Sequence, residues 1–119
     1  MARTSYREQS RTFLAQAFEE LARDDLRQAS EKGWGAASQM VKALAQSRGW
    51  RHERHDLLHS VAQRLSVEER DRAYRRLFHV AGDMHTNFYE GHMDKDEVTS
   101  NLQHVARFVE KLEELLARG

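Results

Sequence analysis

The sequence contains no cysteine and no proline. The lack of cysteine excludes disulfides, thiolate ligands for a metal and cysteine nucleophiles. It is also consistent with a reducing compartment, so we expect a cytoplasmic protein. The lack of proline means that turns depend on glycine and on capping residues, which favours helices over a sandwich of short strands.

Net charge and long apolar runs are also missing. The 19 basic and 19 acidic side chains give a formal net charge of zero, so no overall field draws the protein to nucleic acid or to an anionic membrane. No run approaches the roughly 20 apolar residues that a membrane-spanning helix needs, and the N-terminal segment MARTSYREQS lacks the apolar part of a secretory signal. We therefore expect a soluble protein that is not exported and has no membrane partner.

The composition is typical of amphipathic helices. Charged residues make up 32% and hydrophobic residues 39% of the 119 positions, the balance expected when several helices each turn one face to water. A chain of this length is long enough to bury one core and too short for two. We therefore predict one domain that spans residues 1–119.

The strongest helical pattern lies between residues 24 and 49. Its small and apolar residues recur every three or four positions and fall on one face: Leu26, Ala29, Gly33, Ala37, Met40, Val41 and Leu44. Gly33 and Gly35 flank Trp34, although each glycine costs a helix roughly 1 kcal/mol relative to alanine. Their presence predicts that neighbouring atoms come unusually close. We interpret this segment as the central helix of a bundle.

Capping signals indicate where other helices start. The three-residue spacing of a capping box occurs at Ser5 with Glu8, Ser66 with Glu69, and Asp94 with Glu97. A shorter helix is expected from about 52 to 65, and the helix that begins at residue 66 is expected to end near Glu90 or Gly91. Five amphipathic helices joined by short turns predict an all-α, mostly antiparallel up-down bundle.

Several phrases of the sequence resemble those of a known family. They are QASEK with GWGAA at residues 28–37, RGW at 48–50, and NFYE at 87–90. With the histidine-rich start of the third helix, they make nearly the whole chain similar to the PaREP1 family, within the HEPN-like helical domains. The resemblance implies a helical bundle of HEPN-like type and frequent dimerisation. HEPN-like relatives include RNases that act from a dimer interface, toxin partners of nucleotidyltransferases, and members proposed to bind nucleotides.

The resemblance also suggests where a nuclease site would lie. HEPN-like nucleases carry an arginine, four to six residues and then a histidine. Arg54 with His59 has this spacing and a polar residue after the arginine, whereas Arg72 with His79 lies nearly on one helix face. Both pairs are candidates for catalytic residues.

A cluster of histidines begins the third helix. His52, His55 and His59 have a spacing that can place imidazoles together on one face, as zinc would require. A polar helix start with histidines facing water is the simpler interpretation. We therefore assign no metal ligand and no cofactor.

A second candidate site is the ligand-binding set His85, Asn87, Tyr89 and Glu90. His85 falls within the apolar stripe of the fourth helix, so it needs a hydrogen-bond partner, for instance on another helix. Asn87 and Glu90 are expected to face away from it, either into a groove or into solvent.

Aromatic and basic side chains leave two further possibilities open. Trp34 and Trp50 could stack on a base, although core anchors are the commoner role. One side of the fourth helix is strongly basic, and the last helix has an acidic side; both are expected to be solvated unless they meet a partner. The basic side carries Arg70, Arg72, Arg75 and Arg76.

The sequence leaves two functions open. The first is a non-enzymatic HEPN-like module, a homodimer that binds a nucleotide, RNA or a partner protein such as a nucleotidyltransferase. The alternative is a metal-independent endoribonuclease, in which a histidine transfers protons and an arginine stabilises the phosphate in the transition state.

Overall fold

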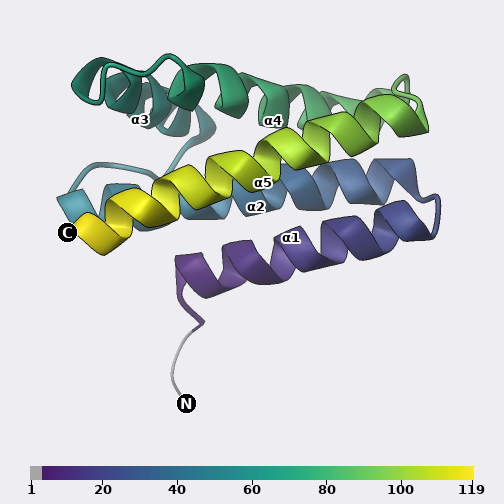
Figure 1. Cartoon of the computed structure of the whole chain (residues 1–119), viewed down its shortest axis with the longest axis horizontal. Helices are drawn as coiled ribbons and strands as arrows, with labels where there is room; N and C mark the ends of the chain where they lie inside the picture. The colour runs from purple at the N-terminus through teal and green to yellow at the C-terminus, as the bar shows by residue number, and fades with distance from the viewer. Residues whose placement is uncertain (1–3) are drawn as a thin grey trace.

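The computed structural model describes residues 4–119, so the first three residues of the N-terminal segment lie outside it. The described chain folds into five α-helices and contains no strand (Figure 1). The predicted all-α class and the number of helices are therefore confirmed for these residues. The helices are α1 (Tyr6–Ala22), α2 (Leu26–Arg48), α3 (His55–Glu68), α4 (Ala73–Glu90) and α5 (Lys95–Arg118).

Three helices begin where short polar side chains satisfy free backbone N–H groups. Ser5 Oγ accepts the N–H of Glu8 at 3.1 Å and starts α1. Asp25 caps α2 in the same way, and Asp94 Oδ1 accepts the N–H of Glu97 at 2.8 Å to start α5. Gly49 ends α2 in the left-handed conformation with φ 71°, which glycine adopts without steric cost.

The boundary between α3 and α4 differs from the prediction. Ser66 does not start the fourth helix, because α3 continues past it to Glu68. The Ser66 hydroxyl instead accepts the N–H of Arg75 at 2.8 Å, in the first turn of α4, and so joins the two helices from the side. The capping-box prediction at residue 66 was wrong because a tertiary contact uses the hydroxyl that the local pattern assigned to a cap.

The centre of the bundle is built around Trp34 on α2, which is only 7% exposed. A Cβ at Gly33 would lie 2.8 Å from Leu102 Cδ2 on α5, and a Cβ at Gly35 would lie 2.9 Å from the Phe13 ring on α1. The predicted close approach at both glycines is confirmed. These positions admit no side chain without movement, which explains why α2 keeps two residues that weaken a helix.

Apolar residues from all five helices form one buried cluster. α2 lies beside α1, α4 and α5, while α3 packs mainly on α4 at one end of the molecule (Figure 1). Leu58, Leu65 and Phe78 anchor α3 on α4 and have no exposed surface. Among residues 4–119, no helix is long and apolar enough to cross a membrane.

Candidate functional site

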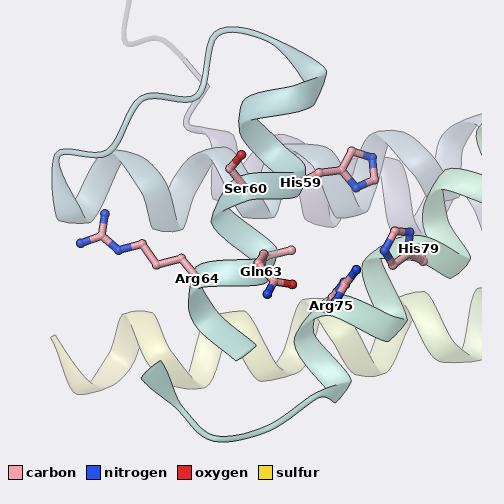
Figure 2. Close-up of a pocket in the computed structure, with 7 residues that line it drawn as sticks. His59, Ser60, Gln63, Arg64, Arg75 and His79 are labelled. Carbon is pink, nitrogen blue, oxygen red and sulfur yellow. The ribbon is translucent and has the colours of Figure 1, made fainter. Parts of the chain in front are cut away.

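The candidate site is a cavity between α3 and α4 with a volume of about 450 Å³ (Figure 2). His59, Ser60, Gln63 and Arg64 come from α3, and Arg75 and His79 come from α4. These side chains are spaced three or four residues apart on each helix, so each helix presents one polar edge to the cavity. The lining contains two histidines and two arginines and no acidic side chain.

A second cavity, of about 760 Å³, continues this space toward the start of α4. It shares Gln63, Arg75 and His79 with the first cavity. Its other lining residues add two more arginines and again no acid; they are Ser66, Val67, Arg72 and Arg76. We call the two cavities together the α3–α4 groove.

Two imidazoles meet inside the α3–α4 groove. The ring centroids of His59 and His79 lie 5.5 Å apart, although the residues belong to different helices. His59 also packs edge-on against Phe78 at 4.8 Å, which holds it against the core. Burial lowers the pKa of His59, and the nearby His79 and His55 lower it further by repelling a positive charge. His59 therefore favours its neutral form when the groove holds no anion.

The arginines of the groove differ in how they are held. Arg64 Nε pairs with Glu68 at 3.1 Å on the same helix. None of the ion pairs within the described part of the chain involves Arg72, Arg75 or Arg76. Three guanidinium groups therefore face the groove or its rim with their charge uncompensated by a bonded carboxylate.

The structure separates one of the two predicted Arg/His pairs. Arg54 lies just before α3, is exposed, and forms a two-point ion pair with Asp56 at 3.1 and 3.0 Å. It does not line the cavity that contains His59. Arg72 and His79, by contrast, both line the second cavity.

The members of the second candidate set differ in how far they are buried. His85 Nδ1 lies 2.9 Å from Glu31 Oε1 on α2, so this histidine has the partner on another helix that the sequence indicated. Asn87 is fully buried: its amide donates to Ser30 Oγ and its oxygen accepts the N–H of Met93, both at 2.9 Å. The expectation that Asn87 lines a groove or faces solvent was wrong.

The exposed end of that set lies apart from Asn87. Tyr89 is 67% exposed, and Glu90 is exposed beside it. The α3–α4 groove is not lined by His85, Asn87, Tyr89 or Glu90. The rings of His85 and Tyr89 lie edge to face with centroids 5.4 Å apart, so the set divides into this pair at the surface and the buried Asn87.

The histidines at the start of α3 do not gather around a common point. His52 Nδ1 lies 2.9 Å from the Trp50 carbonyl oxygen, whereas His55 packs edge-on against Trp34 with centroids 5.3 Å apart. Within residues 4–119, no three histidine, aspartate or glutamate side chains are arranged to hold a metal ion. Despite their regular spacing in sequence, His52 contacts a backbone carbonyl and His55 an aromatic ring.

Sequence reasoning missed Ser60, Gln63 and Arg64 as members of the site. All three lie on the solvent side of the α3 pattern, and only the packing of α3 on α4 shows which of the solvent-facing residues border a cavity. Arg75 was found as part of a basic helix side but not linked to His59. One signal in the sequence could have identified the α3 residues together: positions 59, 60, 63 and 64 are polar and fall along one edge of the helix.

Comparison with known proteins gives one match. The model of the archaeal PaREP1/PaREP8 family matches residues 5–109. No curated protein and no solved structure matches the chain. The family match includes all of α1 to α4 and most of α5, and therefore every residue of the α3–α4 groove. The chain belongs to the archaeal PaREP1/PaREP8 family.

Proposed function

We propose that the protein binds the phosphate groups of a nucleotide or of RNA in the α3–α4 groove. One observation carries the proposal: four arginines and two histidines line a continuous space that no acidic side chain enters. Arginine guanidinium groups bind phosphate through two parallel N–H donors, and imidazole adds a further donor when it is protonated. Because the whole chain has no net charge, this attraction is local to the groove.

The test is the affinity for a short single-stranded RNA whose 2′-hydroxyls are methylated so that it cannot be cleaved. Fluorescence anisotropy would measure its Kd in wild type and in the Arg75→Gln variant. We expect Arg75→Gln to weaken binding by about tenfold, since a hydrogen bond to a charged group contributes roughly 1.5–3 kcal/mol. The slope of log Kd against log salt concentration should also become shallower.

Arg23→Gln is the matched control, because it removes the same charge at the end of α1, far from the groove (Figure 1). Arg23 is exposed and pairs with Glu20 at 3.0 Å, so its removal should leave both stability and Kd nearly unchanged. Equal losses in Arg75→Gln and Arg23→Gln would mean that binding follows net charge alone. Such a result would contradict a phosphate site in the groove.

A second candidate function, metal-independent RNA cleavage, is favoured by the 5.5 Å separation of the His59 and His79 rings. In this reaction one imidazole removes the proton of a 2′-hydroxyl, whose oxygen then attacks the adjacent phosphorus. The second imidazole protonates the departing 5′-oxygen, and the arginines stabilise the charge that develops on the phosphate.

Cleavage is tested with unmodified RNA in the presence of EDTA. If the reaction occurs, His59→Ala and His79→Ala should each slow it by about 100-fold or more, which is the usual contribution of a general acid or base. His104→Ala changes an exposed histidine on α5 and should leave the rate unaltered. Purified protein that leaves the RNA intact, or cleavage that persists in both groove variants, rejects this chemistry while leaving the binding proposal open to its own test.

We also propose a HEPN-like, mostly antiparallel bundle that acts as a homodimer, as the family resemblance implies. A dimer would place two α3–α4 grooves on one particle and could extend the RNA-binding surface. A partner protein, including a nucleotidyltransferase, could associate with the same assembly. Light scattering over a range of concentrations tests the dimer, and a monomeric mass at the highest concentration would count against it.

A further inference from the structure

A small apolar recess lies next to the α3–α4 groove. Its volume is about 170 Å³, and it is lined by Trp50, Leu57 and Val61 together with Arg51, Ser60 and Arg64. This volume is well below the 450 Å³ of the neighbouring cavity. The recess is therefore suited to one planar ring system and not to a whole nucleotide.

The recess and the groove adjoin each other along α3. Ser60 and Arg64 line both the recess and the cavity that contains His59 and His79. A ligand that places a phosphate beside Arg64 therefore has an aromatic wall immediately next to it. A nucleotide likewise carries a charged phosphate close to a flat, largely apolar base.

The Trp50 ring is positioned before any ligand arrives. Its backbone N–H donates to the Ala45 carbonyl at 2.8 Å, directly after the left-handed turn at Gly49. The guanidinium carbon of Arg64 lies 4.0 Å from the Trp50 ring centroid. This stacked pair presents two flat groups, and both kinds of group stack readily on nucleobases.

Glu68 fixes the arginines that surround the tryptophan. Its two carboxylate oxygens accept from Arg48 at 2.9 Å and from Arg64 at 3.1 Å. Arg48 also faces the Trp50 ring, 5.1 Å from its centroid. Trp34 is buried in the core, whereas Trp50 is only partly buried and remains available at the surface.

We propose that this recess is a base-binding subsite for single-stranded RNA. The inference rests on the proposed phosphate binding: one base stacks in the recess beside Trp50 and Arg64 while the adjacent phosphate lies in the α3–α4 groove. Leu57 and Val61 contact the apolar face of the base. Ser60 lines both spaces, and its hydroxyl, which donates to the Asp56 carbonyl, can accept a hydrogen bond from the base edge.

The length of the surface favours a chain of nucleotides over a single one. The lining residues extend along α3 from Leu57 to Val67, which corresponds to about 15 Å at the rise of an α-helix. Four arginines are distributed along this length, and one phosphate can engage only some of them. The base in the recess would then fix the register of a strand held mainly by its phosphates.

The experiment compares two hexamers with the same charge. One is 2′-O-methyl hexa-adenylate, and the other has the same phosphate backbone with abasic sugars. We expect the hexamer with bases to bind wild type roughly 5- to 150-fold more tightly, the range that one stacked base contributes. Trp50→Leu should remove most of this difference while leaving the affinity for the abasic hexamer unchanged, and Trp50→Phe should retain it.

Tyr89→Leu is the matched control, since it removes an aromatic ring that is 67% exposed on α4 and lies outside the recess. It should leave the difference between the hexamers unchanged. A second readout needs no variant: in the wild-type NMR spectrum, the indole N–H of Trp50 should shift with hexa-adenylate and not with the abasic hexamer.

The outcomes separate this inference from the function on which it rests. Equal affinity of the two hexamers, with binding that still depends on Arg75, would overturn the base subsite and leave phosphate binding intact. Absence of binding by both hexamers would overturn both. Adenosine monophosphate that binds as tightly as hexa-adenylate would overturn the choice of a strand, because a single nucleotide would then satisfy the site.

Discussion

His59 on α3 and His79 on α4 are 20 positions apart in sequence, yet their imidazole centroids lie 5.5 Å apart in the α3–α4 groove. Phe78, the neighbour of His79, is fully buried and packs against His59, so the same contact that joins the helices also positions the histidine pair. The arrangement of the site is thus a direct consequence of how the core is packed.

RNA affinity should rise as the pH falls from about 8 to about 6. Burial, His79 and His55 lower the pKa of His59 in the free protein, and a bound phosphate favours the protonated imidazole. Binding therefore takes up a proton, so Kd decreases as the pH falls through the pKa of the complex and levels off below that of the free protein. Anisotropy titrations across this range check it, and a pH-independent Kd would contradict it. His59→Gln should flatten the profile.

Removing the second imidazole should raise the pKa of His59. In the His79→Gln variant the repulsion from a neighbouring positive charge is lost, while the burial of His59 against Phe78 remains. An NMR titration of the His59 ring would report the change. His104→Gln alters an exposed residue on α5 and serves as the control. A pKa of His59 that stays the same or falls in His79→Gln would show that the two rings do not interact electrostatically.

Alanine should have different effects at the two glycines beside Trp34. At Gly33 the new Cβ would lie 2.8 Å from Leu102 Cδ2 and 3.3 Å from Met84 Sδ, and both neighbours are fully buried. We expect Gly33→Ala to lower the free energy of unfolding by about 1–3 kcal/mol through overpacking. At Gly35 the obstacle is the half-buried Phe13 ring, which can turn outward, so Gly35→Ala should cost less. Urea unfolding compares them, and a Gly33→Ala variant more stable than wild type would be the contrary result.

Asn87 should contribute to stability and not to binding. Its side chain joins Ser30 on α2 to the backbone N–H of Met93 before α5. Asn87→Ala would leave that N–H buried without an acceptor, and we expect a loss of about 1–3 kcal/mol in the free energy of unfolding. Tyr89→Ala, on the exposed side of the same turn, should change stability by under about 0.5 kcal/mol. If a folded Asn87→Ala variant bound RNA more weakly than wild type, this prediction would be wrong and Asn87 would belong to the binding site.

The helices could be predicted because the relevant signals are local. Apolar spacing and the caps at Ser5 and Asp94 each act within a few residues of the helix they define. Ser66 gave the same type of signal and failed, because its hydroxyl accepts from Arg75 across the helix pair. A capping pattern cannot reveal a stronger partner that arrives from another element.

The site was less accessible to sequence reasoning because it depends on the angle at which α3 meets α4. His59 and His79 were each found, but as halves of two separate Arg/His pairs. Asn87 was misplaced although it follows the buried Met84 by three residues, a spacing that places both on the same helix face. The prediction for Asn87 gave more weight to its polar side chain than to its position on the buried face of the helix. For a buried hydrogen-bonded amide, position was the better guide.

The most direct test of the account is the NMR spectrum of the protein titrated with 2′-O-methyl hexa-adenylate. We predict that the largest backbone and side-chain shifts fall on His59, Gln63, Arg75 and His79, while the residues of α1 and the solvent-facing side of α5 change little. Shifts centred on α1 or α5, or a spectrum that does not change at saturating RNA, would contradict a phosphate-binding groove between α3 and α4.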